Sequence, residues 1–372
     1  MKVLQLTSHF RPNIGGVETH LDDLCKALVK RGFEISVLTY RPLHTNLAWE
    51  FYEKDKGFDI IRIPWFPHFF YRMANLPFLE FLFLCPGLFF VMPWVLIWKQ
   101  PNVIHAHGLV AAFVGVFWGK LFRKKIIVST HSIYHFPKKG LYKILAFWVL
   151  NSANYCLGLS IQSKEEIKSL GISSRRVGNF IYWVDLNKFK RIANARKLLS
   201  WKKKFIVLFV GRLVEGKGII QLLEAAKIWQ KGIELVIIGS GPMEKNIKKA
   251  QLVVKSIKYE GLIDQSRLPL YYSGSNLLII PSDSDEGFGR VILESLACGT
   301  PVIGSDRGAI SEAINESVGR LIKVNPKNIK NSIEDFYNHR YNLRRMAKNC
   351  RAYAERRYSE KNVETIIKTY SK

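Results

Sequence analysis

The sequence alternates short apolar runs with helical patterns, and this alternation starts twice. An apolar run over 2–7 leads through a glycine-containing loop over 8–16 into a helical pattern over 17–30 and a second apolar run over 34–39. Two strands joined by a helix form a parallel pair, because a crossover has to bring the chain back to the same edge of the sheet. The alternation begins again at the apolar run over 204–210. The pattern therefore predicts an α/β protein with two parallel sheets.

The length of the chain also favours two domains, because 372 residues exceed the size at which a single core usually stops growing. We expect a Rossmann-like domain over 1–182, a polar linker rich in Lys and Arg over 183–203, and a second Rossmann-like domain over 204–352. Residues 353–372 are expected to form a final helix that can cross back to the first domain.

Residues 64–98 differ in composition from the rest of the chain. The part from Leu76 to Trp98 is almost wholly apolar and aromatic, but Glu80, Gly87 and two prolines interrupt it. Three structures fit this pattern: a transmembrane helix, a helical hairpin in a membrane interface with its tryptophans at headgroup depth, and a buried helix pair. We favour the interfacial hairpin, because the prolines disfavour a straight span and a span would separate elements of one sheet.

The charge of the chain is strongly positive, with 56 Lys and Arg against 30 Asp and Glu. A field of this sign attracts nucleic acid, an anionic membrane surface or phosphorylated substrates, although a solvated Lys-rich surface is the plainer explanation. Basic residues at 123–125, 138, 139 and 143 flank the apolar segment in sequence. No nucleic-acid-binding motif is present, so nucleic acid is not an expected partner. Apolar and basic features together favour a peripheral membrane protein.

The cysteines and the amino terminus indicate a reducing compartment. The five cysteines are dispersed, with no Cys-x-x-Cys pair, and are expected to be buried thiols. The opening MKVLQLTSHF has no apolar signal region and is expected to form a strand. We expect a cytoplasmic enzyme at the inner face of a membrane.

The second half contains a candidate anion site within residues 281–306, PSDSDEGFGRVILESLACGTPVIGSD. A loop with Gly287 and Gly289 leads into a helix expected to begin near Arg290, and a helix start offers free N–H groups and a positive dipole end. Glu286 and Glu294 are placed to accept hydrogen bonds from sugar hydroxyls. The structural alternatives are an ion pair between Glu294 and Arg290 and a capping role for Glu286.

Two further glycine-rich loops follow strands of the same half. Residues 211–218, GRLVEGKG, place Arg212 and Lys217 where ligands of open parallel sheets bind, and these cations suit a diphosphate. Gly239, in the sequence GSGP, is a weaker signal of the same kind. Asp283 and Asp285 imitate an Asp-x-Asp metal motif, but a metal is not required where two cations and a helix start already supply positive charge.

These motifs resemble those of family 4 of the retaining glycosyltransferases, which have the GT-B architecture. The Glu286–Gly-Phe-Gly–Glu294 pattern is among the more specific marks of that family, and FRPNIGGVETH over 10–20 and VIHAHG over 103–108 resemble its amino-terminal motifs. The resemblance covers nearly the whole chain. It departs at 178–185, GNFIYWVD, where the family usually carries Pro-Asn-Gly-Val-Asp, so Asn179 and Asp185 receive no role.

The resemblance implies a role for each candidate residue. It implies that Arg212 and Lys217 neutralise the donor diphosphate, that Glu294 holds the ribose, and that Glu286 with the backbone of Phe288 and Gly289 binds the hexose. From the first domain, which would bind the acceptor, His107 would contact the transferred sugar, with His105 the less favoured neighbour. Gly15 and Gly16 would pack against the diphosphate across the cleft between the two facing sheets. Alanine at Lys217 or Glu294 is expected to abolish transfer and leave the fold intact.

The function expected on these grounds is retaining transfer of a hexose or N-acetylhexosamine from a nucleotide-diphosphate sugar to a lipid-linked or phospholipid acceptor. The nucleotide sugar is a co-substrate, and neither a cofactor nor a metal is expected. The alternatives are a soluble glycosyltransferase acting on a sugar or sugar phosphate, a GT-B enzyme such as an epimerase, and, more remotely, a nucleic-acid-binding protein. The sequence does not distinguish uracil from guanine in the donor.

Overall fold

The computed structural model describes residues 1–13, 15–43, 47–66, 77–201 and 204–371. The chain divides into two compact units. Unit 1 contains residues 1–181 and the carboxyl-terminal residues 362–372, and unit 2 contains residues 182–361. The last helix of the chain thus belongs with the first domain.

Unit 1 is built on a sheet in the order β3-β4-β2-β1-β5-β6-β7-β8. All its pairs are parallel except β3–β4, which is antiparallel at one edge. The strands are β1 (Lys2–Thr7), β2 (Glu34–Tyr40), β3 (Tyr52–Asp55), β4 (Phe58–Ile63), β5 (Val103–His107), β6 (Lys125–Thr130), β7 (Tyr155–Gly158) and β8 (Val177–Asn179).

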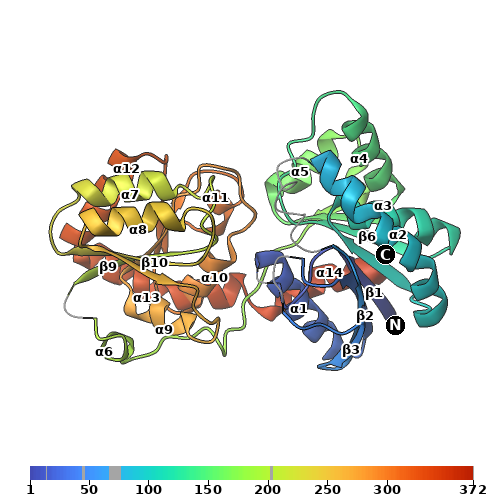
Figure 1. The fold of residues 1–372 in the computed structure, drawn as a ribbon, viewed down its shortest axis with the longest axis horizontal. Coiled ribbons are helices and arrows are strands. Elements are labelled where there is room, and N and C mark those ends of the chain that lie inside the picture. Colours follow the sequence, from blue (N-terminus) through green and yellow to red (C-terminus); the bar gives the residue numbers. More distant parts are fainter. Residues whose placement is uncertain (14, 44–46, 67–76, 202–203, 372) are drawn as a thin grey trace. The chain divides into compact units, whose positions relative to one another are not determined.

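Helices cover both faces of this sheet. Figure 1 shows α2, α3 and α4 on one side and α1 and α14 on the other. The α2–α4 side forms a large apolar core with strand residues such as Leu4, Leu38 and Ile104. The helices are α1 (Gly16–Val29), α2 (Pro77–Lys99), α3 (Leu109–Leu121), α4 (Leu141–Ser152), α5 (Ile161–Ser169), the 3-10 turn η2 (Ser174–Arg176) and α14 (Val363–Ser371).

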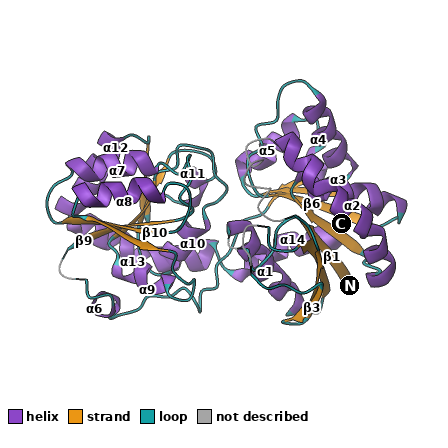
Figure 2. Cartoon of the chain, in the orientation of Figure 1, coloured by secondary structure: helices purple, strands orange, loops and turns teal. Residues whose placement is uncertain are grey.

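Unit 2 has a wholly parallel sheet in the order β11-β10-β9-β12-β13-β14. The strands are β9 (Phe205–Val210), β10 (Ile233–Ile238), β11 (Ile257–Gly261), β12 (Leu277–Ile280), β13 (Val302–Ser305) and β14 (Gly319–Ile322). The helices are α6 (Ala195–Leu198), α7 (Ile219–Ile228), α8 (Glu244–Val253), α9 (Leu268–Gly274), α10 (Arg290–Ala297), α11 (Ile310–Ala313), α12 (Pro326–Asn338), α13 (Arg340–Arg357) and the 3-10 turn η3 (Glu360–Asn362). Figure 2 shows α7, α8 and α12 on one face of the sheet and α9, α10 and α13 on the other.

The strand order of unit 2 is the 3-2-1-4-5-6 order of doubly wound sheets, and the chain has the two α/β units with parallel sheets that the sequence predicted. The neighbours β1 and β5 in unit 1, like β9 and β12 in unit 2, lie where the strand order reverses. At such a point the two adjacent strands send their loops to opposite faces, which opens a crevice at their carboxyl ends. The topology therefore fixes where each unit can bind a ligand.

The structure draws the domain boundaries differently from the sequence analysis. Residues 183–201, expected to be part of a linker, pack on unit 2, where Phe189 and Ala195 are buried. Arg351 of α13 donates hydrogen bonds to the carbonyls of Leu186 and Phe189, so this polar stretch is fixed by backbone contacts that its composition does not reveal. The final helix expected over 353–372 is two helices, and only α14 joins unit 1. Residues 202–203 lie outside the described part.

The apolar segment forms one helix where the sequence favoured a hairpin. Helix α2 continues through Pro86 and Pro93, because side chains of unit 1 bind backbone groups near both prolines. The Tyr40 hydroxyl accepts from the Leu88 N–H (3.0 Å) and donates to the carbonyl one turn earlier, so it is inserted into the helical ladder. The Trp118 indole donates to the Phe89 carbonyl (2.9 Å), which Pro93 has no N–H to satisfy. Residues 67–76 of the predicted segment lie outside the described part.

Helix α2 is long and apolar enough to cross a membrane by length and composition alone, and among the described helices it is the one that meets this test. One of its faces, with Leu84, Leu88 and Met92, packs into the core of unit 1. The other face is exposed. Trp94 and Phe90 are 72% and 71% exposed there.

The Tyr40 hydroxyl is expected to stabilise unit 1. We predict that Tyr40→Phe lowers the free energy of unfolding by about 1–2 kcal/mol, because the inserted hydroxyl serves two backbone groups of a buried helix turn. Gly87→Ala should cost about 1–3 kcal/mol, because a Cβ there would lie 2.6 Å from the Tyr40 hydroxyl oxygen. Urea denaturation measures both changes. Tyr341→Phe is the control, since Tyr341 is 77% exposed, and an equal loss in that variant would contradict the assignment.

Candidate functional site

The candidate residues fall into two groups, one in each unit. In unit 2, the loops that follow β9, β10 and β12 meet at the carboxyl edge of the sheet, around the point where the strand order reverses. Their glycines allow this approach. A Cβ on Gly218 would lie 1.7 Å from the Pro281 carbonyl oxygen, and a Cβ on Gly239 would lie 1.8 Å from the Gly211 carbonyl oxygen. Gly239 thus has a packing role in the interlocked loops, which its sequence motif did not specify.

Lys217 and Glu286 form an ion pair across two of these loops. The Lys217 Nζ lies 2.6 Å from Glu286 Oε2, and both side chains are largely buried, at 23% and 14% exposure. Ser282 also donates a hydrogen bond to the Glu286 carboxylate. The structure therefore brings a predicted phosphate-binding cation and a predicted sugar-binding carboxylate into direct contact. A diphosphate would bind the Lys217 ammonium and a sugar hydroxyl would bind the Glu286 carboxylate, and in this structure the two groups are paired with each other.

Glu294 is buried and bonded within the protein. Its Oε2 accepts from the Tyr272 hydroxyl at 2.9 Å, and its Oε1 lies 3.5 Å from Arg290 Nε, so the ion pair weighed as the structural alternative is present. Arg290 and Glu294 are only 8% and 3% exposed. Alanine at Glu294 would leave a buried guanidinium without this carboxylate and cost several kcal/mol. We therefore expect Glu294→Ala to lower stability as well as activity, and Glu294→Gln is the better test of the site.

Helix α10 begins at Arg290, as predicted, directly after the glycine-rich loop. Gly289 is its N-cap residue, with a φ of 61° that favours glycine, and glycine has no side chain to cap the helix. Phe288 is 1% exposed and its ring packs edge-on against Tyr358, so only its backbone can face a ligand. The free N–H groups of α10 thus start beside Glu286.

Besides Lys217 and the exposed Arg212, a third cation, Arg307, follows a strand of this sheet. Arg307, which follows β13, donates to the Asp283 carbonyl, and its Nε lies 3.9 Å from Asp285. Asp283 in turn accepts from the Gln221 amide at 3.0 Å. The aspartates that imitate a metal motif therefore have partners in the protein, and the described residues contain no cluster of three or more potential metal ligands. Sequence reasoning missed Arg307, because GSDRGA over 304–309 contains no cation motif.

In unit 1, the glycine loop leads into α1. Gly15 is the N-cap residue of this 14-residue helix and, as a glycine, has no side chain to cap it. A Cβ on Gly15 would lie 2.2 Å from the Glu18 carboxylate, whereas a Cβ on Gly16 would meet none of the described atoms within 4 Å. The helix start is therefore open at Gly16 and lies beside the Glu18 carboxylate at Gly15.

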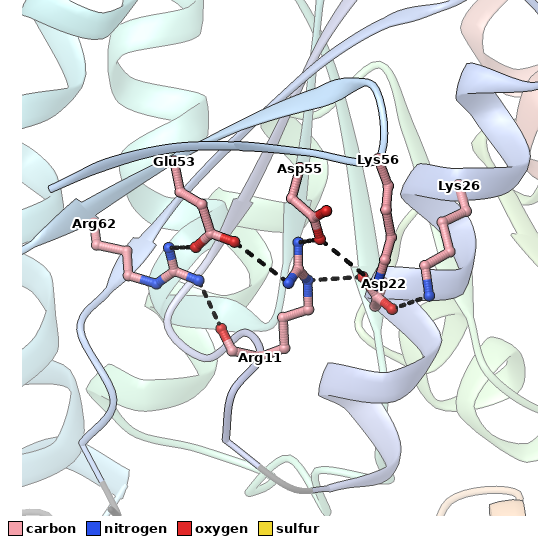
Figure 3. Close-up of polar contacts among 7 residues, drawn as sticks. All are labelled: Arg11, Asp22, Lys26, Glu53, Asp55, Lys56 and Arg62. Atoms are coloured by element: carbon pink, nitrogen blue, oxygen red, sulfur yellow. Dashed lines mark hydrogen bonds and ion pairs between the residues drawn. The ribbon is translucent and has the colours of Figure 1, made fainter. Parts of the chain in front are cut away.

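An ion-pair network, shown in Figure 3, holds the loop before Gly15. The Arg11 guanidinium lies between the carboxylates of Asp22 on α1 (2.8 Å) and Asp55 on β3 (2.7 Å), with Glu53 at 3.5 Å. Arg62, which is 2% exposed, pairs with Glu53 (2.6 Å) and donates to the Arg11 carbonyl (3.0 Å). The β3–β4 hairpin thereby fixes the loop backbone. Sequence analysis had predicted neither the hairpin nor the network, because its strands are short and partly charged.

His107 ends β5, next to the strand-order reversal of unit 1. Its Nε2 lies 2.7 Å from Gln5 Oε1 and its Nδ1 lies 3.0 Å from His131 Nε2. His105 bonds Tyr370 and Ser129, both at 2.7 Å. Both ring nitrogens of the candidate His107 are thus engaged inside unit 1. Any contact with a sugar is left to its ring edge, its backbone or an exchange of partners. The sequence did not predict His131 as a neighbour.

Burial keeps these histidines neutral. Desolvation lowers the pKa of His105 and of His131 to about 3, with a further contribution from His131 to the shift of His105. The pKa of His107 is lowered well below its usual value, first by desolvation and then by the neighbouring His105, His131 and His20. A neutral imidazole can donate a hydrogen bond from one nitrogen and accept one at the other, as the hydrogen bonds at both ring nitrogens of His105 and His107 require.

These shifts predict acid sensitivity. Between about pH 6.5 and pH 3 the unfolded chain binds protons at these histidines that the folded chain does not, so stability falls as the pH falls. Each histidine should contribute a slope of about 1.4 kcal/mol per pH unit in that window. His105→Asn should lower the slope of the unfolding free energy against pH by about 1.4 kcal/mol per pH unit, which corresponds to one proton. The same slope in variant and wild type would contradict the neutral assignment.

Two family models match the chain. The one described as Glycosyltransferase Family 4 matches residues 14–181, and the one described as Glycosyl transferases group 1 matches residues 190–357. The chain belongs to glycosyltransferase family 4. The family resemblance stated from the sequence motifs is confirmed, and the chain is a glycosyltransferase.

The similarity to known proteins covers most of this chain and most of theirs. A glycosyltransferase of Methanocaldococcus jannaschii is 29% identical over 349 residues, which are 88% of this chain and 86% of that protein. A phosphatidylinositol N-acetylglucosaminyltransferase component from Arabidopsis thaliana is 22% identical over 346 residues, 90% of this chain and 74% of that protein. The structure of Anabaena HepE in complex with UDP has a TM-score of 0.80 at 20% identity and covers 100% of both chains, which shows the shared fold.

Proposed function

We propose that this glycosyltransferase moves a hexose or N-acetylhexosamine from a nucleotide-diphosphate sugar to a lipid-linked or phospholipid acceptor, with retention of configuration. The observation that carries the proposal is the Lys217–Glu286 pair beside the start of α10, at the strand-order reversal of unit 2. A nucleotide sugar requires this combination, because it presents an anionic diphosphate next to neutral hydroxyls.

Donor binding in this proposal exchanges the partners of the ion pair. Lys217 turns to the diphosphate, while Glu286 accepts hydrogen bonds from the sugar and Arg212 adds a second positive charge. As the bond to the anomeric carbon breaks, negative charge grows on the leaving phosphate, and fixed cations and helix N–H groups stabilise it there. No metal ion takes part. HepE, which shares the fold, was crystallised with UDP, and this supports a nucleotide donor.

Retention follows from attack on the face that the leaving group vacates. The departing phosphate accepts the proton of the acceptor hydroxyl, so no carboxylate pair is required on opposite sides of the sugar, in contrast to glycosidases. Gly15, Gly16 and His107 are assigned to the same reaction from unit 1. The open space at Gly16, in the first turn of α1, supports close approach of a ligand to this loop.

The membrane-associated acceptor is proposed from an exposed apolar surface on unit 1, formed by α2, α3 and α4. We call it the apolar surface; its large side chains with the highest exposure are Phe78, Leu82, Phe90, Trp94, Ile97, Trp98, Leu121, Leu141 and Ile144. Soluble monomers rarely expose so many neighbouring large apolar side chains. Exposed cations from the same elements and their flanking loops, including Lys120, Arg123 and Lys138, add attraction to anionic lipid. The Arabidopsis relative is named for transfer to phosphatidylinositol, which supports a lipid acceptor. We place the enzyme at the cytoplasmic face of a membrane as a peripheral protein.

Lys217→Ala should lower the turnover number by about 100-fold or more, because the leaving phosphate loses a fixed positive charge. Glu294→Gln should raise the KM for the donor about ten-fold, because the ribose loses a charged acceptor. Release of UDP or GDP is measured with UDP-glucose, UDP-N-acetylglucosamine and GDP-mannose over vesicles that contain phosphatidylinositol. Lys227→Ala, at an exposed lysine of α7, is the matched control. Wild-type turnover by folded Lys217→Ala would refute the site.

Membrane docking is tested by vesicle flotation. Wild type should float with vesicles that contain anionic phosphatidylglycerol, less so in high salt and less with neutral phosphatidylcholine. Replacing Phe90 and Trp94 together by serine should abolish flotation. The matched control replaces Leu252 and Val253 of unit 2, which are 86% and 79% exposed, by serine and should float as wild type does. Absence of flotation by wild type would favour a soluble acceptor.

A further inference from the structure

A continuous chain of hydrogen-bonded side chains runs through the interior of unit 1. It joins residues from both ends of the sequence, since Tyr370 of α14 bonds Gln5 of β1, 365 positions apart. The chain is His131–His107–Gln5–Tyr370–His105–Ser129, with successive distances of 3.0, 2.7, 3.3, 2.7 and 2.7 Å. Its four central members, which lie between His131 and Ser129, are each at most 5% exposed. Solvent is therefore excluded from its middle.

Gln5 gives the chain a direction. Its Oε1 faces His107 and can only accept, so His107 Nε2 carries the proton. A neutral His107 then has an unprotonated Nδ1, which accepts from the N–H on His131 Nε2. On its other side Gln5 donates from Nε2 to the Tyr370 hydroxyl. Every bond up to that hydroxyl thus points from His131 towards Tyr370.

The Tyr370 hydroxyl is the partner of the Gln5 amide N–H in this orientation. Because it accepts from Gln5, its own proton goes to His105 Nδ1, and His105 Nε2–H then donates to Ser129. If Gln5 turned its amide over, its NH2 would face His107 Nε2 and the His107 proton would move to Nδ1. By accepting from the Gln5 amide, the Tyr370 hydroxyl supports the orientation that goes with the Nε2–H tautomer of His107.

We propose that Tyr370 is a positioning residue for glycosyl transfer, which acts through Gln5 to hold His107 in its Nε2–H tautomer and in a single orientation. The inference rests on the proposed role of His107 at the transferred sugar. Because Tyr370 lies on α14, residues late in the sequence take part in positioning a candidate residue of unit 1.

Other contacts of α14 allow the hydroxyl to be tested alone. Arg31 Nε pairs with Glu364 at 2.7 Å, and Lys125 Nζ donates to the Tyr370 carbonyl at 3.0 Å. The Tyr370 ring packs edge-on against Phe33 and His105. Tyr370→Phe keeps these contacts and removes only the hydroxyl, so α14 stays docked.

Tyr370→Phe should lower kcat by about ten- to a hundred-fold, the cost of a misplaced group at a reacting centre, and change the KM for the donor by less than about two-fold. Tyr40→Phe is the matched control. It also removes a buried hydroxyl of unit 1 and lowers stability, but it should keep the kcat of the folded enzyme. Equal kcat losses in both variants would show a general effect of stability and overturn the proposal.

A double-mutant cycle with Gln5→Met tests the route. If Tyr370 acts through Gln5, the double variant should have the kcat of Gln5→Met alone, because the second change has nothing left to position. If the kcat losses of the two single variants multiply in the double variant, Tyr370 acts by another path and the proposed route is overturned.

Ring nitrogen-15 shifts of the histidines report tautomers without any turnover. In the full-length wild type, His107, assigned by comparison with His107→Gln, should show a protonated Nε2 and an unprotonated Nδ1, and Tyr370→Phe should show averaged values. A wild-type Nδ1–H tautomer, or unchanged shifts in the variant, would overturn the inference. Should wild type transfer none of the sugars tested, the proposed function would fail while the tautomer result still decides the coupling.

Discussion

The structure depends on two reversals of strand order, between β1 and β5 and between β9 and β12. At each, neighbouring parallel strands send their loops to opposite faces, so a crevice opens that no other edge of the sheet provides. The glycine loops, the starts of α1 and α10, and the candidate charges all lie at these points. The loops can interlock there because Gly218 and Gly239 bring backbone within contact of backbone, where a Cβ would collide with a carbonyl oxygen. The strand order therefore sets where the candidate site lies, and the side chains set which groups it offers.

Charged and polar groups inside each unit are arranged as closed networks. Arg11 is held by three carboxylates and Arg62 by a carboxylate and a carbonyl, so these cations fix a loop and do not serve a ligand. His105 and His107 are bonded without charge, because each neutral ring can donate from one nitrogen and accept at the other. Lys217 and Glu286 differ, since in the proposed reaction each gives up the other as partner, Lys217 for the diphosphate and Glu286 for the sugar hydroxyls. This difference separates residues that build the site from those proposed to act in it.

Much of the fold followed from periodicity. The strands β1, β2 and β9 and the start of α10 lie within a residue or so of the predicted positions, because buried parallel strands are continuous apolar runs between turns. The hairpin β3–β4 was not predicted, since β3 is charged and only four residues long. Helix α2 was expected to break at its prolines, and it continues because Tyr40 and Trp118, distant in sequence, bind its backbone carbonyls. For the same reason the candidate site was predicted as a set of residues and not as a geometry.

The sequence by itself determined the fold class, the two glycine-rich candidate loops and the family, because these depend on local patterns of apolar residues, glycines and charges. Only the tertiary structure decided the partners. It paired Lys217 with Glu286, buried Glu294 against Arg290 and Tyr272, and joined Gln5 to Tyr370 across nearly the whole chain. The physical reason is that hydrogen bonds and ion pairs act over a few ångströms in space. Which side chains come that close is set by how the sheets and helices pack, and local sequence does not specify it.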